Sequence, residues 1–390
     1  MHSPEGFFCR ADAAPAGGGK AAGALEQQHR DAGFGAGCSA VSWQGGGGRH
    51  LFGRNYDFDR LAQGSGVLFV PRAWAYRTCL DGSDPRPGEA CRARYAALGM
   101  GVVLPGGAPV LYEGVNECGL MGAQLYYRQF AHYLPGGRPG LPRVQPGLAL
   151  GHLLAQCASV EEAARLLADG MGLAGLPLAG SVPPLHWMLA DRTGEAMVVE
   201  PDAGGLQIYR NTAGVLTNSP PYPWHRLNLL NYTGVQAADR GGMQAGDEVV
   251  EPCFSGSGGQ GLPGDFSAPA RFVRLAFLRE HTLPGRTEDA DAAAGFHLLQ
   301  NAAFPLGAVR VADAPPPARL DSGILPFDYT VYSVVLCAES RRLYWTTWDN
   351  LRVQCVEMAP LLARRTLARL DLPAGADIAF RNGEMREAGV

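Results

Sequence analysis

Cys38 begins a strand-like stretch, and the next strand-like stretch, after a glycine-rich turn, returns Arg54 and Asp57 toward it. An isolated cysteine at a strand start is usually a packed core residue, and an isolated Arg–Asp pair is usually a surface ion pair. Together they suit nucleophilic catalysis, because the thiolate is the reactive form and nearby positive charge lowers its pKa. Cleavage of the Gly37–Cys38 bond would add a free α-amine, whose pKa of about 7.7–8.0 suits a general base at neutral pH.

Other reactive-looking residues have plainer interpretations. His186 allows a Cys–His hydrolase, but its apolar neighbours favour a buried core histidine. Cys118 occupies a turn position and is expected to be inert. The glycine-rich segment 255–261 lacks the Lys-Ser/Thr of a phosphate-binding loop and is interpreted as a mobile loop beside the pocket.

The composition excludes several classes of function. The chain has 390 residues, 46% apolar content and a net charge of −4, so nothing indicates nucleic-acid binding. No apolar run reaches membrane-spanning length, and no secretory signal is visible, so we expect a cytoplasmic protein. The only lysine is Lys20, which argues against Schiff-base chemistry. Nine scattered cysteines without a C-x-x-C pair indicate neither zinc nor a disulfide framework, and we expect no metal or cofactor.

The chain divides into a leader and one domain. Of residues 1–37, 17 are Gly or Ala, which is typical of a disordered leader or pro-segment, or of a misassigned start. Residues 38–390 read as strands, then helices, then strands, which predicts an α+β layered fold. Helices are expected at 148–157, at 160–169 behind a capping box formed by Ser159 and Glu162, at 270–279 and at 289–301. Strands are expected at 67–71, 100–104, 111–115, 120–127, 185–191, 196–200, 329–335 and 342–348.

Eight short stretches in a fixed order resemble one known family. They are Gly37-Cys38-Ser39, Gly53 to Phe58, Tyr112 to Glu117, Gly119 to Ala123, Pro184 to Trp187, Leu216 to Pro220, Gly261 to Phe266 with Arg271 to Arg274, and Tyr329 to Tyr332. From Cys38 almost to its end, the chain resembles the choloylglycine hydrolase family, and within it the penicillin V acylases. The resemblance implies the αββα four-layer sandwich of N-terminal-nucleophile hydrolases, and a homotetramer.

The resemblance also implies roles for six residues. Cys38 would be the N-terminal nucleophile, unmasked by loss of everything before it. Arg54 would lie by the thiolate and Asp57 would orient the α-amine. Asn218 and the backbone N–H of Tyr126 would form the oxyanion hole, although the sequence at Asn218 also suits an Asx turn. Arg271, otherwise a plain structural cation, would complete the charge cluster, and the two arginines would hold Cys38 as a thiolate.

The expected activity is hydrolysis of a linear amide in a small-molecule substrate. Tyr126 stands where penicillin V acylases resemble one another in having Tyr and bile-salt hydrolases in having Asn, so the resemblance favours phenoxyacetyl or similar apolar acyl amides. Cleavage of glycine- or taurine-conjugated bile acids is the alternative, and N-acyl-homoserine lactones are a more distant one. A silent binding protein on the same fold remains open if Cys38 is never unmasked.

Overall fold

The computed structural model describes residues 37–80, 90–104, 109–178, 180–310, 327–373 and 375–384. Most of the expected leader, residues 1–36, lies outside these ranges. Two large antiparallel sheets dominate the described part of the chain. Their long strands are rich in β-branched and aromatic residues and are almost entirely buried, as expected for sheets covered on both faces.

The first sheet carries the expected nucleophile. Its strand order is β14-β1-β2-β18-β19-β20, with β17 paired to β18. The strands are β1 (Gly37–Gln44), β2 (His50–Phe58), β14 (Val215–Leu216), β17 (Val309–Arg310), β18 (Phe327–Cys337), β19 (Arg342–Thr347) and β20 (Gln354–Glu357).

The second sheet packs against the first. Its order is β13-β12-β11-β8-β7-β6-β3-β21. The strands are β3 (Gly66–Val70), β6 (Ala97–Val103), β7 (Pro109–Asn116), β8 (Met121–Tyr126), β11 (Leu185–Ala190), β12 (Ala196–Asp202), β13 (Gly205–Tyr209) and β21 (Ala368–Asp371). Short pairs lie outside the two sheets: β4 (Ala75–Arg77) with β5 (Ala90–Arg92), β9 (Arg143–Val144) with β10 (Gly172–Leu173), and β15 (Met243–Ala245) with β16 (Glu248–Val250).

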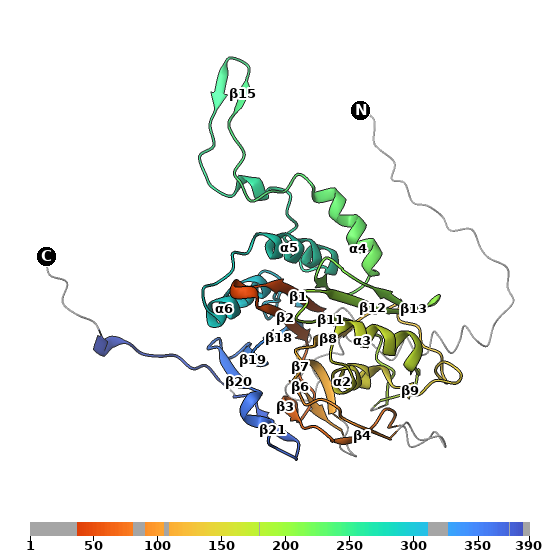
Figure 1. Ribbon diagram of the computed structural model, residues 1–390. Helices are drawn as coiled ribbons and strands as arrows, with labels where there is room; N and C mark the ends of the chain where they lie inside the picture. The colour runs from red at the N-terminus through yellow and green to blue at the C-terminus, as the bar shows by residue number, and fades with distance from the viewer. Residues whose placement is uncertain are drawn as a thin grey trace, which may run out of the picture.

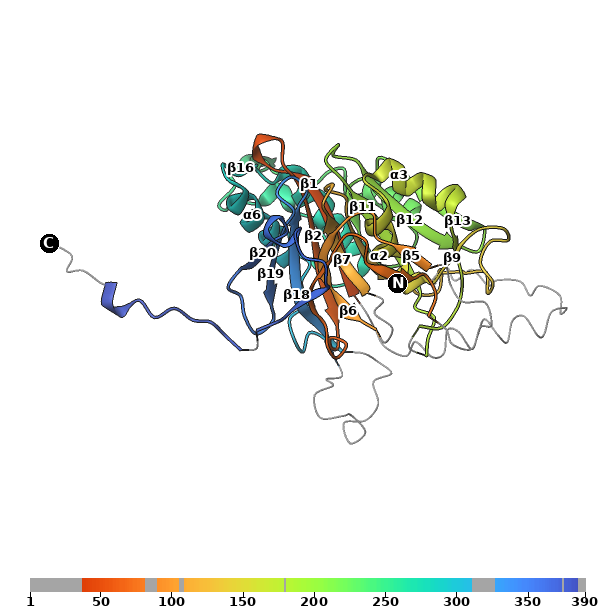
Figure 2. The same cartoon turned by 60° about the horizontal axis from the view of Figure 1, so that its bottom comes forward.

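Helices cover both outer faces. Helices α5 (Ala268–His281) and α6 (Glu288–Gln300) pack on the first sheet, and α4 (Tyr222–Asn228) packs against α5. Helices α2 (Pro146–Gln156) and α3 (Val160–Arg165) lie over the second sheet, so Figure 2 shows the two sheets between α6 on one side and α2 and α3 on the other. The expected αββα sandwich in a single domain is confirmed.

The helix boundaries follow local sequence signals. Ser267 caps α5 by accepting from the N–H of Ala270, and Thr287 caps α6 in the same way through Ala290. The predicted capping box is present, since the Ser159 hydroxyl accepts from the N–H of Glu162. The predicted helix 160–169 differs in one respect: it is α-helical only to Arg165 and continues as a π-helical turn over Leu166–Gly170.

The glycine-rich segment 255–261 does not lie where we expected. The backbone N–H and the hydroxyl of Ser257 both donate to Asp239 Oδ1. These two residues lie at the base of an excursion, residues 239–257, that carries β15 and β16. None of the segment lines the cavity at Cys38. The excursion projects from the helical layer beside α4 and α5 (Figure 1).

Candidate active site

Strand pairing places the nucleophile and its neighbours. Cys38 is the second residue of β1 and pairs with Tyr56 of β2. Side chains alternate along a strand, so Cys38, Arg54 and Tyr56 face the second sheet, whereas Ser39 and Asp57 face α5. The thiol and the backbone nitrogen of Cys38 therefore have separate surroundings.

The thiol faces a cavity of about 140 Å³ between the two sheets. Arg54 donates from Nη2 to the Cys38 sulfur at 3.3 Å. The rings of Phe58 and Tyr126 stack at 6.0 Å beside it, and those of Tyr56 and Tyr112 lie 5.2 Å apart. The remaining lining residues are Asp57, Val110, Gln124, Gly147, Leu178, Pro183 and Leu185. The cavity is therefore mostly apolar and aromatic, with the sulfur at its wall.

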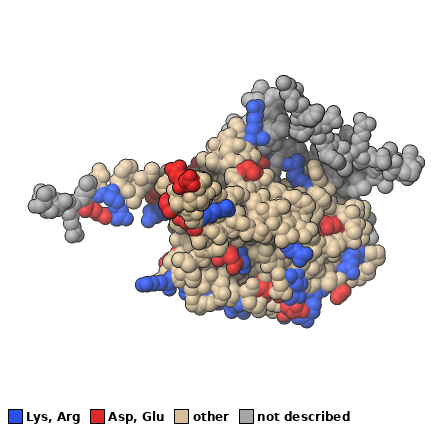
Figure 3. Space-filling model, turned by 90° about the horizontal axis from the view of Figure 1, so that it is seen from above, with Lys and Arg blue, Asp and Glu red and all other residues tan. Residues whose placement is uncertain are grey.

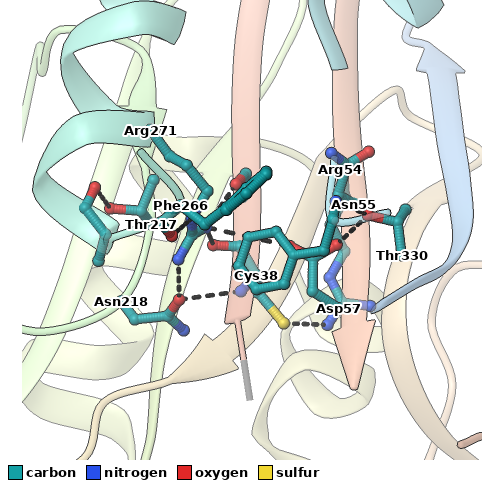
Figure 4. Close-up of polar contacts among 12 residues, drawn as sticks. Cys38, Arg54, Asn55, Asp57, Thr217, Asn218, Phe266, Arg271 and Thr330 are labelled. Carbon is teal, nitrogen blue, oxygen red and sulfur yellow. Dashed lines mark hydrogen bonds and ion pairs between the residues drawn. The ribbon is translucent and has the colours of Figure 1, made fainter. Parts of the chain in front are cut away.

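The backbone of Cys38 is held by a separate polar network (Figure 4). Its N–H donates to Asn218 Oδ1 at 2.9 Å, and Arg271 donates to the same oxygen at 2.8 Å. Arg271 also donates to the Cys38 carbonyl and the Ser39 hydroxyl, each at 2.6 Å. Asn218 Nδ2 donates to the Tyr126 carbonyl at 2.9 Å, which ties β8 to the nucleophile. A fixed donor and acceptor array thus surrounds the start of β1.

Asp57 completes this network. It is fully buried, and Thr330 Oγ1 donates to its Oδ1 at 2.5 Å. Its Oδ2 lies 4.0 Å from Arg271 Nη1 and has no hydrogen-bond partner in the described residues. Burial raises the pKa of Asp57 to about 7, although Arg271 opposes the rise. Asp57 Oδ2 is therefore free to accept a hydrogen bond, and its role in orienting an α-amine of Cys38 stays a prediction.

The geometry corrects one expectation. We expected Arg54 and Arg271 to hold Cys38 as a thiolate, but Arg271 bonds the backbone of Cys38 and not its sulfur. Burial raises the pKa of the Cys38 thiol, and the opposing charges of Arg54 and, more weakly, Arg271 do not cancel this rise. In this geometry the thiol is held protonated, so a base is needed to activate it.

All six predicted residues come together at this site. Asn218 is not the Asx turn of the alternative interpretation, because its side chain bonds to Cys38, Arg271 and Tyr126, all distant in the chain. Arg271 is 2% exposed and belongs to the network. The carbonyl and ring of Tyr126 are in place, and the oxyanion role of its N–H stays a prediction.

Sequence reasoning missed four contributors. Glu113 and Tyr332 contact Arg54, Thr330 contacts Asp57, and the Gln124 carbonyl accepts from Arg54 at 3.2 Å. The first three lie inside the stretches that carry the family resemblance, which was the available signal.

His186 has no part in this arrangement. It is fully buried, its Nδ1 lies 3.2 Å from Glu200, and its Nε2 lies 2.9 Å from the Thr217 carbonyl. Its ring also stacks on Tyr127 at 4.6 Å. The core-histidine interpretation is confirmed, because both ring nitrogens are occupied away from Cys38.

The described residues show neither a metal-binding cluster nor a membrane-spanning helix. They contain no group of three or more His, Cys, Asp or Glu side chains arranged to hold a metal ion. Within the same ranges no helix has the length and hydrophobicity needed to cross a membrane.

Comparison with known proteins agrees with the geometry. Residues 38–363 match the family model for linear amide C–N hydrolases of the choloylglycine hydrolase family. The chain is 31% identical to the bile salt hydrolase/transferase of Clostridium perfringens, over 82% of this chain and 92% of the relative. It is 30% identical to a conjugated bile acid hydrolase of Lactobacillus gasseri, over 80% and 93%.

Solved structures share the architecture. A variant of the conjugated bile acid hydrolase from Clostridium perfringens superposes with a TM-score of 0.77 at 28% identity, covering 88% of this chain and all of that one. Penicillin V acylase from Agrobacterium tumefaciens superposes with a TM-score of 0.65 at 20% identity, over 86% and 92%, which shows a common fold. The chain thus belongs to the choloylglycine hydrolase family and is a hydrolase of carbon–nitrogen bonds in linear amides.

Proposed function

We propose that this enzyme cleaves the amide bond of glycine- or taurine-conjugated bile acids. One observation carries the proposal: relatives named for bile salts are about 30% identical over most of both chains, and that similarity includes the region of the six clustered residues. This substrate was the alternative in the sequence analysis, and the comparisons favour it over penicillin V.

The proposed reaction begins with release of the Cys38 amine. In the structure the Cys38 nitrogen is still bonded to Gly37, whereas the family match begins at Cys38. We propose that residues 1–37 are removed, and that the new α-amine lies between Asn218 Oδ1 and the vacant oxygen of Asp57. Such an amine supplies the base that the protonated thiol requires.

The chemical steps then follow the geometry. The amine takes the proton of the Cys38 thiol, and the sulfur attacks the amide carbonyl carbon. Asn218 Nδ2 and the Tyr126 N–H would donate to the oxyanion, a role for which aimed donors in a dry site are effective. The proton passes to the leaving nitrogen as the carbon–nitrogen bond breaks. Water then cleaves the thioester, which releases the acid and restores the thiol.

A second substrate class is favoured by the cavity itself. Its volume of about 140 Å³ is below the roughly 300–1,000 Å³ of typical small-molecule pockets, and aromatic rings line it. A compact aromatic acyl group, such as the phenoxyacetyl group of penicillin V, fits these dimensions without any opening of the site.

The test separates both substrates from a silent binding protein. Intact mass is measured for the wild type and for Cys38→Ala, and each is assayed with glycocholate, taurocholate and penicillin V. We expect loss of residues 1–37 and hydrolysis of the bile-acid conjugates in the wild type alone. Faster release of 6-aminopenicillanic acid would instead favour the second class. Full-length mass and no turnover in the wild type would contradict the mechanism.

A further inference from the structure

Arg54 is shared between two acidic groups. Its Nη2 reaches the Cys38 sulfur at 3.3 Å, while its Nη1 donates to Glu113 Oε2 at 2.5 Å. Tyr332 joins the pair, because its hydroxyl accepts from Arg54 Nη1 at 3.0 Å and donates to Glu113 Oε2 at 3.1 Å. Arg54 is 2% exposed, and Glu113 and Tyr332 are at most 1% exposed, so water does not screen these contacts.

Each of the two partners reaches Arg54 through a one-residue irregularity in its strand. In β18, Thr330 pairs with Asp57 but Tyr332 pairs with Tyr56, which leaves Val331 as an extra residue. In a regular register without this bulge, Val331 would pair with Tyr56, and Tyr332 would pair with Asn55 and face the helices instead of Arg54.

A one-residue bulge also occurs in the second sheet. In β7, Glu113 pairs with Met100 and Leu111 pairs with Gly101, so Tyr112 is the extra residue. Leu111 packs under α2, whereas Tyr112 and Glu113 both face the space between the sheets. Bulges are enriched beside active sites, where they redirect side chains. Two bulges in two sheets thus deliver two side chains to one guanidinium.

The charges around Glu113 are unequal. Three groups face the Glu113 carboxyl: Arg54 from β2, Tyr332 from β18 and Tyr112 from its own strand. Of these three only Arg54 is a cation, and it also contacts the Cys38 thiol. Glu113 Oε1 has no hydrogen-bond partner among the described residues. Burial raises the pKa of the Glu113 carboxyl, and Arg54 opposes the rise. When it is ionised, Glu113 competes with a developing thiolate for the charge of Arg54.

We propose that Glu113, with Tyr332, is a positioning residue that orients Arg54 toward the Cys38 sulfur and governs how readily that thiol ionises. Glu113 does not touch the reacting atoms and acts through Arg54. The inference rests on the proposed function only in taking Cys38 as the nucleophile.

Glu113→Gln tests the charge and keeps the shape. The folded protein is labelled with iodoacetamide at a series of pH values and then digested, and mass spectrometry measures the labelled fraction of the peptide that contains Cys38. Gln can still accept from Arg54 but carries no charge, so the labelling midpoint should fall by about one pH unit. The acid limb of kcat/KM should move in the same direction. An unchanged midpoint in a folded variant would overturn the proposal.

Two further variants complete the experiment. Glu195→Gln removes a carboxylate from a partly exposed pair with Arg210 and should leave the labelling midpoint unchanged. Tyr332→Phe removes the bridging hydroxyl and should lower kcat about 10-fold with little change in KM. An unchanged kcat would count against the proposal. This variant also tests the proposal if Glu113→Gln fails to fold. A Cys38 that labels normally but lacks amidase activity in the wild type would instead contradict the proposed function.

Discussion

At the scale of single residues, the Asn218 side chain connects three parts of the site. Its oxygen accepts from Cys38 and Arg271, and its nitrogen donates to Tyr126. One N–H of that amide remains for an oxyanion. We therefore expect Asn218→Ala to lower kcat by about 10²–10³-fold, as loss of one oxyanion donor typically does. Single-turnover kinetics would check this, and a loss confined to KM would contradict the role.

Asp57 carries a pH prediction of its own. Burial raises its folded-state pKa to about 7, above the value near 4 that an unfolded chain has. Between about pH 4 and pH 7 the folded state therefore holds the extra proton, and stability falls as pH rises through this window. In uncleaved Cys38→Ala protein, Asp57→Asn should raise Tm at pH 8 but have little effect at pH 4. Equal effects at both pH values would show that Asp57 does not titrate in this way.

At the scale of elements, the sequence predicted what periodicity and caps determine. Helices were expected at 270–279 and 289–301, and the structure begins α5 and α6 slightly earlier, behind the caps Ser267 and Thr287. The strand that carries Cys38 followed from its pattern and its turn. The bulges at Tyr112 and Val331 were not predictable, because one extra residue changes the facing of a strand without changing its composition. Glu113 and Tyr332 were missed for that reason, although they lie in recognised motifs.

A substitution at Gly37 would test how the start of β1 packs in the uncleaved protein. A Cβ at this position would lie 2.5 Å from the Phe304 ring, and the backbone N–H of Phe304 donates to Thr330 Oγ1. Gly37→Ala should therefore destabilise uncleaved Cys38→Ala protein by about 1–3 kcal/mol, as overpacking typically does. Denaturant unfolding measures the change. Gly136→Ala, where no atom lies within 4 Å of the new Cβ, is the matched control, and equal effects of the two would contradict this packing.

At the scale of the whole molecule, the charge distribution and the projecting excursion describe the surface. On the face shown in Figure 3, the Arg side chains of the described residues are interspersed with Asp and Glu and form no continuous basic patch. The excursion carries exposed apolar side chains on and near β15 and β16, namely Met243, Val249, Val250 and Phe254. Apolar groups on a projecting hairpin are typical of an interaction site.

We expect this excursion to bind a second copy of the chain, since the family resemblance predicts a homotetramer. Exposed strand edges and apolar side chains bury well against a neighbouring subunit. Val249→Asp combined with Phe254→Ser should therefore reduce the molar mass measured by light scattering, and should leave the labelling of Cys38 unchanged, because neither residue lines its cavity. The control is Leu283→Asp, which changes a still more exposed apolar residue outside the excursion. A monomeric wild type, or equal mass in both variants, would show that the excursion does not mediate self-association.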